Sequence, residues 1–213
     1  MSLRPFDVAN RALAAATVGL LALLGLSLRL AEASVSIPVT FDDLVRRATA
    51  VAVVTPIDEH GVWEAGRIVT YTRVRVERRV AGRLAAEVWV HTDGGAVGKI
   101  GQLVEGEATL KLGKDSLVFL HPRSDGLSII GSSDGGATTT FGVVEGAQGQ
   151  FPIATGGHPS PRLVVSPGMG GLLPTSSTQP LARDVLVDVA LEDAANAIAA
   201  AWTRWHPAGQ EAP

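Results

Sequence analysis

The chain has 213 residues, with 18 basic and 21 acidic residues, a formal net charge of −3 at pH 7 and no cysteine. The lack of cysteine excludes disulfides, a cysteine nucleophile and thiolate-bound zinc. The slight acidity and the absence of a basic stripe argue against nucleic-acid binding, because Lys and Arg must neutralise the phosphates.

The first 33 residues have the pattern of a secretory signal peptide. A basic start precedes an uncharged run rich in Ala and Leu over residues 12–28, and the small residues Ala31 and Ala33 follow. We therefore expect cleavage between Ala33 and Ser34 and export to the periplasm, the cell envelope or the medium. The alternative is an inner-membrane anchor formed by residues 12–28, because a membrane span needs about 17–25 apolar residues.

Signal cleavage would leave a mature chain that is slightly more acidic than the full one. Three of the 18 basic and two of the 21 acidic residues lie in the leader, which leaves a net charge of −4. A mature chain of this size can bury one hydrophobic core.

The mature chain begins with a short helix and a buried strand. Thr40 is a helix N-cap with Asp43 in the capping-box position, which predicts a helix over residues 41–48. The apolar run over residues 50–57 predicts a buried strand, and residues 58–66 are interpreted as a loop.

Residues 67–80 have the clearest periodicity in the sequence. Even positions carry mostly Ile, Thr and Val, whereas most odd positions are charged. This alternation predicts a strand with one wet face, which should bend because a straight strand of this length exceeds the width of a compact domain. Gly82 predicts a turn, and residues 86–91 predict the second strand of a hairpin.

The outward face of this hairpin is the candidate partner-binding surface. It combines Arg73 and Arg75 on the first strand with Glu87, Trp89 and His91 on the second. Trp and Arg are enriched where partners dock. The alternative is a solvated sheet face held by cross-strand pairs, with the arginines pairing with Glu87 or stacking on Trp89.

The remaining strands are predicted from short apolar runs over residues 108–112, 116–120, 127–130, 138–144 and 150–153, of which 116–120 is the most apolar and therefore central. Residues 154–180 are rich in Gly, Pro, Ser and Thr and predict a long loop, with disorder favoured over a functional role. Asp188 is the expected N-cap of a helix to Arg204. The apolar stripe of this helix should pack on the β core.

Together these elements predict a mainly β protein: a single barrel-like or sandwich antiparallel domain with a short N-terminal helix and a C-terminal helix. The expected order is a signal peptide (1–33), a β-rich domain (34–154), a Gly/Pro/Ser-rich loop (155–181) and a C-terminal helical segment that packs on the β domain (182–213).

Two stretches carry a resemblance to a known family. They are Val104-Glu-Gly106 followed by Gly113 and Leu117-Val-Phe-Leu120, and Val144-Glu-Gly-Ala-Gln-Gly149-Gln-Phe151. From about Thr40 to Ile153 the chain resembles a family of uncharacterised exported bacterial β-rich proteins. The resemblance implies an envelope or secreted module, and it implies no reaction and no active residues.

Two stretches partly match catalytic motifs, and an ordinary turn explains each of them better. Residues 131–135 fit the G-x-S-x-G pattern around Ser133, but a strand-forming run follows where a hydrolase elbow needs a helix. Residues 94–99 depart from the phosphate-loop pattern. His91 and His121 lack metal-ligand spacing, so we expect no metal and no cofactor.

The sequence therefore predicts an exported, non-catalytic β module that binds a protein or a cell-envelope component, with no nucleic-acid partner and with membrane contact only through an uncleaved N-terminus. The alternative is a small secreted hydrolase that uses Ser133 or a His91/His121 site.

Overall fold

The computed structural model describes residues 35–123, 139–156, 159–175 and 177–207, which belong to one compact unit. The expected signal peptide, the Ala33–Ser34 junction, the strand predicted over 127–130 and Ser133 lie outside the described residues. Among the helices of the described part, none is long and apolar enough to cross a membrane.

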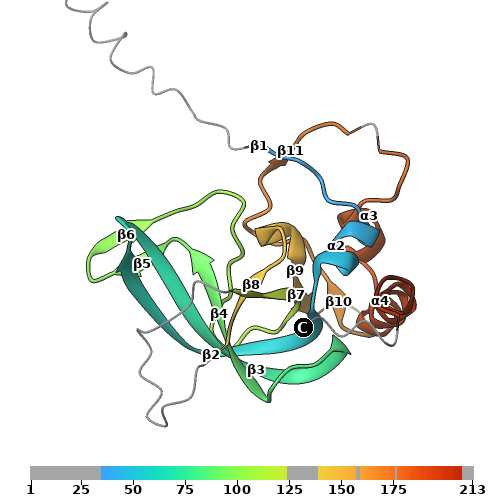
Figure 1. Ribbon diagram of the computed structural model, residues 1–213, viewed down its shortest axis with the longest axis horizontal. Coiled ribbons are helices and arrows are strands. Elements are labelled where there is room, and N and C mark those ends of the chain that lie inside the picture. The colour runs from blue at the N-terminus through green and yellow to red at the C-terminus, as the bar shows by residue number, and fades with distance from the viewer. Residues whose placement is uncertain (1–34, 124–138, 157–158, 176, 208–213) are drawn as a thin grey trace, which may run out of the picture. The chain divides into compact units, whose positions relative to one another are not determined.

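The elements follow one another as a β-rich region flanked by helices, which confirms the mainly β fold class with helices near both ends (Figure 1). The strands are β1 (Val35–Ser36), β2 (Ala50–Glu64), β3 (Arg67–Gly82), β4 (Glu87–Asp93), β5 (Gly95–Val97), β6 (Ile100–Gln102), β7 (Ser116–Arg123), β8 (Thr140–Val143), β9 (Gln150–Ala154), β10 (Arg162–Leu163) and β11 (Gly171–Leu172). The helices are α2 (Phe41–Arg47), α3 (Ala182–Leu186), α4 (Leu191–Trp205) and a 3-10 turn, η1 (Gly146–Gly149).

The main sheet closes on itself. Its described strands follow the order β10-β9-β7-β2-β3-β4-β8, and β8 also pairs with β7, so that β2, β3, β4, β8 and β7 form a ring. The pairing of β4 with β8 is parallel, whereas the other pairings in this ring are antiparallel. This five-stranded Greek-key barrel has the strand arrangement of an OB fold. The parallel pair departs from the expected antiparallel sheet.

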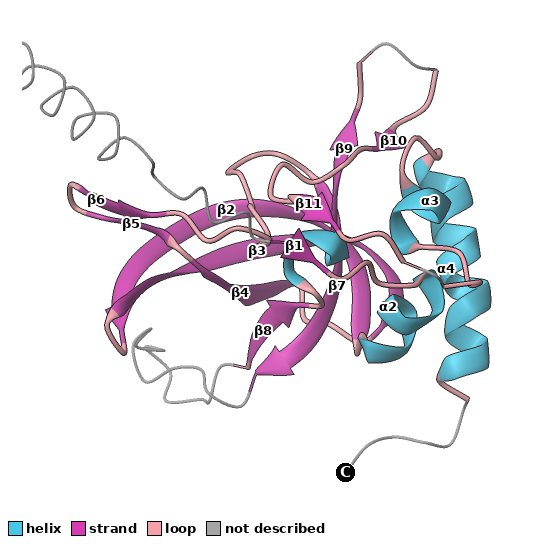
Figure 2. Cartoon of the chain, turned by 90° about the horizontal axis from the view of Figure 1, so that it is seen from above, coloured by secondary structure: helices cyan, strands magenta, loops and turns pink. Residues whose placement is uncertain are grey.

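Long, bent strands make the closure possible. The β2–β3 pairing contains register shifts at three places, between Val51 and Ala52, between Val53 and Val54, and between Pro56 and Asp58. Such irregularities add local twist and bend a strand. The predicted bend of the strand after residue 67 is therefore confirmed, and Figure 2 shows β2 and β3 curving together along the barrel.

Two apolar layers hold the fold together, one on each side of β2 and β7. Ala50, Ala52 and Val54 face the barrel interior, whereas Val51 and Val53 face the helices. This two-sided burial explains why these strands are apolar without alternation. The outer layer joins Phe119 and Phe151 to Leu44 of α2 and Ile198 of α4, which confirms that the C-terminal helix packs on the sheet.

Two buried glutamines fasten loops to the barrel. The Gln148 side chain accepts a hydrogen bond from the Val39 amide (2.8 Å) and donates one to the Ile37 carbonyl (2.9 Å). Gln150 is 1% exposed; its amide accepts from the Thr109 N–H (2.8 Å) and donates to the Thr109 carbonyl (2.6 Å). The Gln-Gly-Gln-Phe stretch is thus a structural clamp, with Gly149 required because a Cβ there would lie 2.0 Å from the Val144 carbonyl oxygen.

The structure corrects several predicted elements. Residues 58–64 continue β2 and are not a loop, because they pair with β3 as far as the turn at Ala65 and Gly66. No strand forms over 108–112 among the described residues, although Ala108 and Leu110 are buried as their alternation predicts. The Gln150 side chain bonds to the Thr109 backbone, where a neighbouring strand would otherwise bond.

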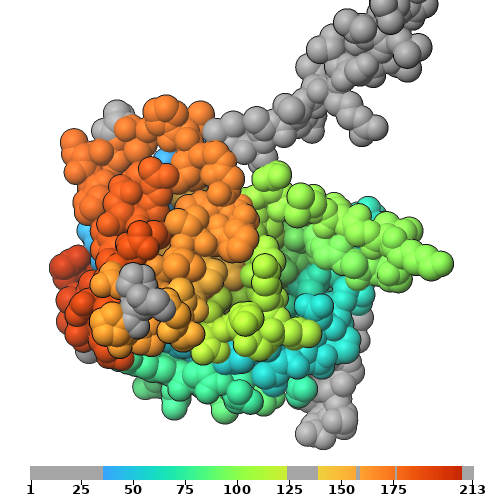
Figure 3. Space-filling model, turned by 180° about the vertical axis from the view of Figure 1, so that it is seen from behind, coloured from blue at the N-terminus to red at the C-terminus, as the bar shows by residue number. Residues whose placement is uncertain are grey.

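The C-terminal third also differs from the prediction. The loop expected over 155–181 contains β10, which pairs with β9, and β11, which pairs with β1, so disorder is not what its described part adopts. Figure 3 shows this segment lying against the barrel. Asp188 does not cap α4; it has a left-handed backbone (φ +61°) after α3, a separate short helix within the predicted 182–213 helical segment, and the N-cap of α4 is Ala190.

Candidate functional site

The strand register places the charged and aromatic residues of β2, β3 and β4 in rows on the outside of the barrel. Trp89 of β4 lies opposite Arg73 of β3, which in turn pairs with Asp58 of β2. Glu87 lies opposite Arg75 in the next row. We name this surface the Trp89 face and define it by Asp58, His60, Arg73, Arg75, Glu87 and Trp89.

Arg73 is the centre of this surface. Its guanidinium carbon lies 6.0 Å from the centroid of the Trp89 ring, within the range of a cation–π contact. The same guanidinium lies 3.5 Å from a Glu87 carboxylate oxygen and 3.8 Å from an Asp58 oxygen. The two carboxylates and the indole thereby hold Arg73 in place while 42% of its side chain stays exposed.

His60 supports Trp89 from the neighbouring strand. The two ring centroids are 5.7 Å apart with planes tilted by 37°, and His60 Nε2 lies 3.3 Å from an Asp58 oxygen. Trp89 therefore has an Arg and a His as ring neighbours. A large aromatic group fixed in this way loses little conformational entropy when a partner docks.

Arg75 has a partner other than the expected Glu87. Its Nε donates to Glu77 at 2.7 Å. This hydrogen bond is the largest cause that raises the pKa of Arg75 and lowers the pKa of Glu77, and a second hydrogen bond from Thr55 lowers the pKa of Glu77 further. Of the two predicted arginines, Arg73 and not Arg75 forms the ion pair with Glu87.

His91 does not belong to the accessible surface, contrary to the prediction. Although it lies in the outward row of β4, it is 5% exposed and stacks edge-on against Tyr71 with centroids 5.0 Å apart. Tyr71 in turn donates to Glu64 at 2.7 Å. The alternation along β4 predicts the face on which His91 lies, but it does not predict that His91 and its neighbour Tyr71 are buried there.

The two histidines of the alternative hydrolase site lie in one row. His91 of β4 and His121 of β7 flank Gly142 of β8, to which both are paired. A Cβ at residue 142 would lie 2.8 Å from His121 Nε2, so a larger residue there would displace the His121 ring. In the part of the chain that the structure covers, no three His, Cys, Asp or Glu residues are arranged to hold a metal ion.

The comparisons with known proteins add no name to this geometry. No protein-family model, curated protein or solved structure matches the chain. The resemblance to exported bacterial β-rich proteins therefore stays a prediction.

The predicted surface does not include Asp58 and His60, because the sequence predicts a loop over residues 58–66. The sequence carries little signal for this extension of β2, because three polar residues stand in a row over 58–60 and the pairing with β3 shifts register between Pro56 and Asp58. Four of the five predicted residues, Arg73, Arg75, Glu87 and Trp89, do lie together on the Trp89 face.

Proposed function

We propose that this protein is an exported, non-catalytic binding module that docks a protein partner of the cell envelope on the Trp89 face. The observation that carries the proposal is the fixed Arg73–Trp89 pair, surrounded by half-exposed charges of both signs. Trp and Arg are the residues that most often dominate the energy of a protein interface. The outer surface of these strands is also where OB barrels bind ligands, which supports the proposal by analogy of fold.

The mixed charges favour a protein over a nucleic acid as the occupant. Arg73 and Arg75 are balanced on the same surface by Asp58, Glu77 and Glu87. A surface without net positive charge gains little from releasing the counterions of a phosphate backbone.

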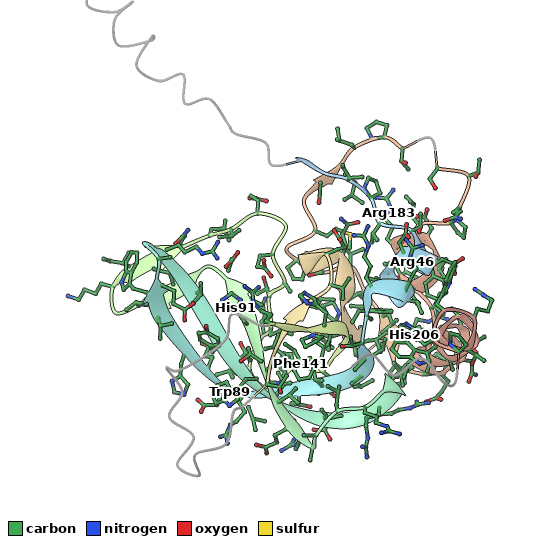
Figure 4. The ribbon with its side chains drawn as sticks, viewed as in Figure 1. Arg46, Trp89, His91, Phe141, Arg183 and His206 are labelled. Atoms are coloured by element: carbon green, nitrogen blue, oxygen red, sulfur yellow. The ribbon has the colours of Figure 1, made fainter. Side chains whose placement is uncertain are left out.

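Site-specific photo-cross-linking in the producing cell tests the location of the interface. A benzophenone amino acid in place of Glu87 should trap one partner, whereas the same group in place of Arg183 of α3 should not. Arg183 is a matched control because it is 49% exposed and Figure 4 shows it on the helical side, away from Trp89. Equal trapping from both positions, or from residue 183 alone, would contradict the proposed face.

Export itself predicts a defined mature N-terminus. The protein recovered from the envelope or the medium should have the mass of residues 34–213, because signal peptidase cuts after a small-x-small triplet. Intact-mass spectrometry checks this result. A mass that includes residues 1–33 would instead favour the membrane-anchored alternative.

The hydrolase alternative is supported by one observation, the common row of His91 and His121. The burial of His91 leaves it poorly placed to reach a substrate, so we favour the binding module.

A further inference from the structure

A cavity of about 490 Å³ lies at one end of the barrel, on the opposite side of β3 and β4 from the Trp89 face. Among its lining residues are Glu59, Thr70, Thr72, Thr92, Asp93 and Glu107. We name it the mouth cavity. Its volume falls in the range of about 300–1,000 Å³ that is typical of small-molecule sites.

The barrel interior changes from apolar to hydroxyl-bearing as it approaches this cavity. Along β3 the inward positions change from Val74 to Thr72 and Thr70, and along β4 they change from Val90 to Thr92. Valine has nearly the shape of threonine and buries no hydroxyl, so packing alone favours valine at such positions. The threonines therefore make this end of the interior polar, and two of them donate to backbone carbonyls, Thr70 to Gly94 (2.7 Å) and Thr92 to Thr70 (3.5 Å).

One buried acceptor in the cavity, on Asp93, has no partner within the described part of the chain. Its Oδ1 atom is buried and lacks a described hydrogen-bond partner, while its Oδ2 atom lies 3.5 Å from Arg67. Thr72, which is 1% exposed, lines the same cavity. Buried polar groups are rarely left without a partner.

The charge of the lining identifies the kind of occupant. Glu59, Asp93 and Glu107 supply three carboxylates, and neither Lys nor Arg is among the described lining residues. Burial raises the pKa of Glu107, and the nearby Asp93 charge raises it further, while the Ala108 N–H and Arg123 lower it. A bound cation would relieve this cost, because an opposite charge favours an ionised carboxylate.

We propose that the mouth cavity binds a small organic ammonium ion, whose N–H groups donate to Asp93 and Thr72 and whose charge is balanced by Glu59 and Glu107. An amino sugar and an aliphatic diamine share this chemistry. The site is independent of the Trp89 face, because it uses the inward side chains of the same strands.

Calorimetric titration of the purified full chain with matched pairs of compounds tests the proposal. Glucosamine is compared with N-acetylglucosamine, and 1,4-diaminobutane is compared with 1,4-butanediol. At least one amine should bind about tenfold or more tightly than its neutral counterpart, and the pair that shows this difference identifies the source. Binding by none of the four compounds, or equal binding within both pairs, overturns the proposal.

Two substitutions localise the binding. Thr72→Val should weaken it about tenfold without lowering the melting temperature, because the new side chain fills the same space without a buried hydroxyl. Thr203→Val on the exposed surface of α4 is the matched control and should keep full affinity. Unchanged affinity in Thr72→Val would overturn the assignment to this cavity.

The pH dependence supplies two readouts, the stability of the free protein and its affinity for the amine. The pKa of Glu107 is raised in the folded state. The stability that this group contributes is therefore fully present below its unfolded pKa and is lost as pH rises through its folded pKa. Glu107→Gln keeps the acceptor for Ala108 and cannot ionise, so it should raise the melting temperature at neutral pH and leave it unchanged in acid. Amine affinity of the parent protein should fall in acid over the same pH window, and an affinity independent of pH would contradict the role of Glu107.

Discussion

Replacing Gln150 with leucine is expected to lower the free energy of unfolding by about 2–4 kcal/mol, since each polar group left unsatisfied costs about 1–3 kcal/mol. The substitution removes the acceptor of the Thr109 N–H and the donor to the Thr109 carbonyl. It also removes the acceptor of the Ser166 hydroxyl, which lies 3.0 Å away. Urea-induced unfolding of the parent and the variant measures the difference.

The expected loss has a structural reason beyond the count of bonds. Gln150 is the point where the 108–110 segment and the loop around Ser166 attach to β9. Without it, Ala108 and Leu110 lose the attachment that holds them in the barrel interior, where both are buried. Leucine has a volume close to that of glutamine, so the effect reports the lost amide and not a cavity.

Two further variants separate this role from a general sensitivity to leucine. Gln179→Leu changes an exposed glutamine in a loop and should alter stability by less than about 0.5 kcal/mol. Gln150→Glu keeps the acceptor of the Thr109 N–H but, when ionised, cannot donate to the carbonyl. Its destabilisation should therefore shrink in acid, where the carboxyl regains a proton, and a loss that is equal at both pH values would contradict the clamp.

The sequence was sufficient for the fold class because hydrophobic periodicity is a local signal. The period of two over residues 67–80 predicts that Ile68, Thr72 and Val74 point inward, and all three are buried, although Val69 and Tyr71 on the other face are buried as well. The two apolar runs over 50–57 and 116–120 also became central strands, since each packs against the helices on one face and the barrel interior on the other.

Barrel closure could not be predicted in the same way. It depends on β8, a strand of four residues that pairs in parallel with β4 and antiparallel with β7. So short a strand has no periodicity of its own. The place of Gln148 and Gln150 could not be predicted for a related reason, because their partners lie up to 112 residues away along the chain.

The candidate sites show the same division. Arg73 and Trp89 could be assigned to one surface, because neighbouring strands of a hairpin have a predictable facing pattern. The mouth cavity could not be found, since Glu107 and Asp93 come from a loop and a strand end whose approach depends on the complete fold. The change from Val74 to Thr72 was the signal available in the sequence, and its meaning depended on knowing that this position faces a cavity.

Trp89→Ala is expected to cause the largest loss of binding. An aromatic anchor at the centre of an interface typically contributes about 2 kcal/mol or more, which corresponds to roughly a 30-fold weaker dissociation constant. Arg73 loses its ring contact in this variant but keeps its carboxylates, so the barrel should remain folded. Arg75→Glu should weaken binding to a smaller extent, because it reverses a charge at the edge of the face.

The dissociation constant of the partner trapped from position 87, measured with purified proteins by calorimetry, tests the account most directly. We expect it to rise about 30-fold in Trp89→Ala and to stay within about twofold in Arg183→Glu, whose side chain lies on α3 away from the Trp89 face. Equal affinity of the parent protein and Trp89→Ala, with the variant folded, would contradict a binding function for this face.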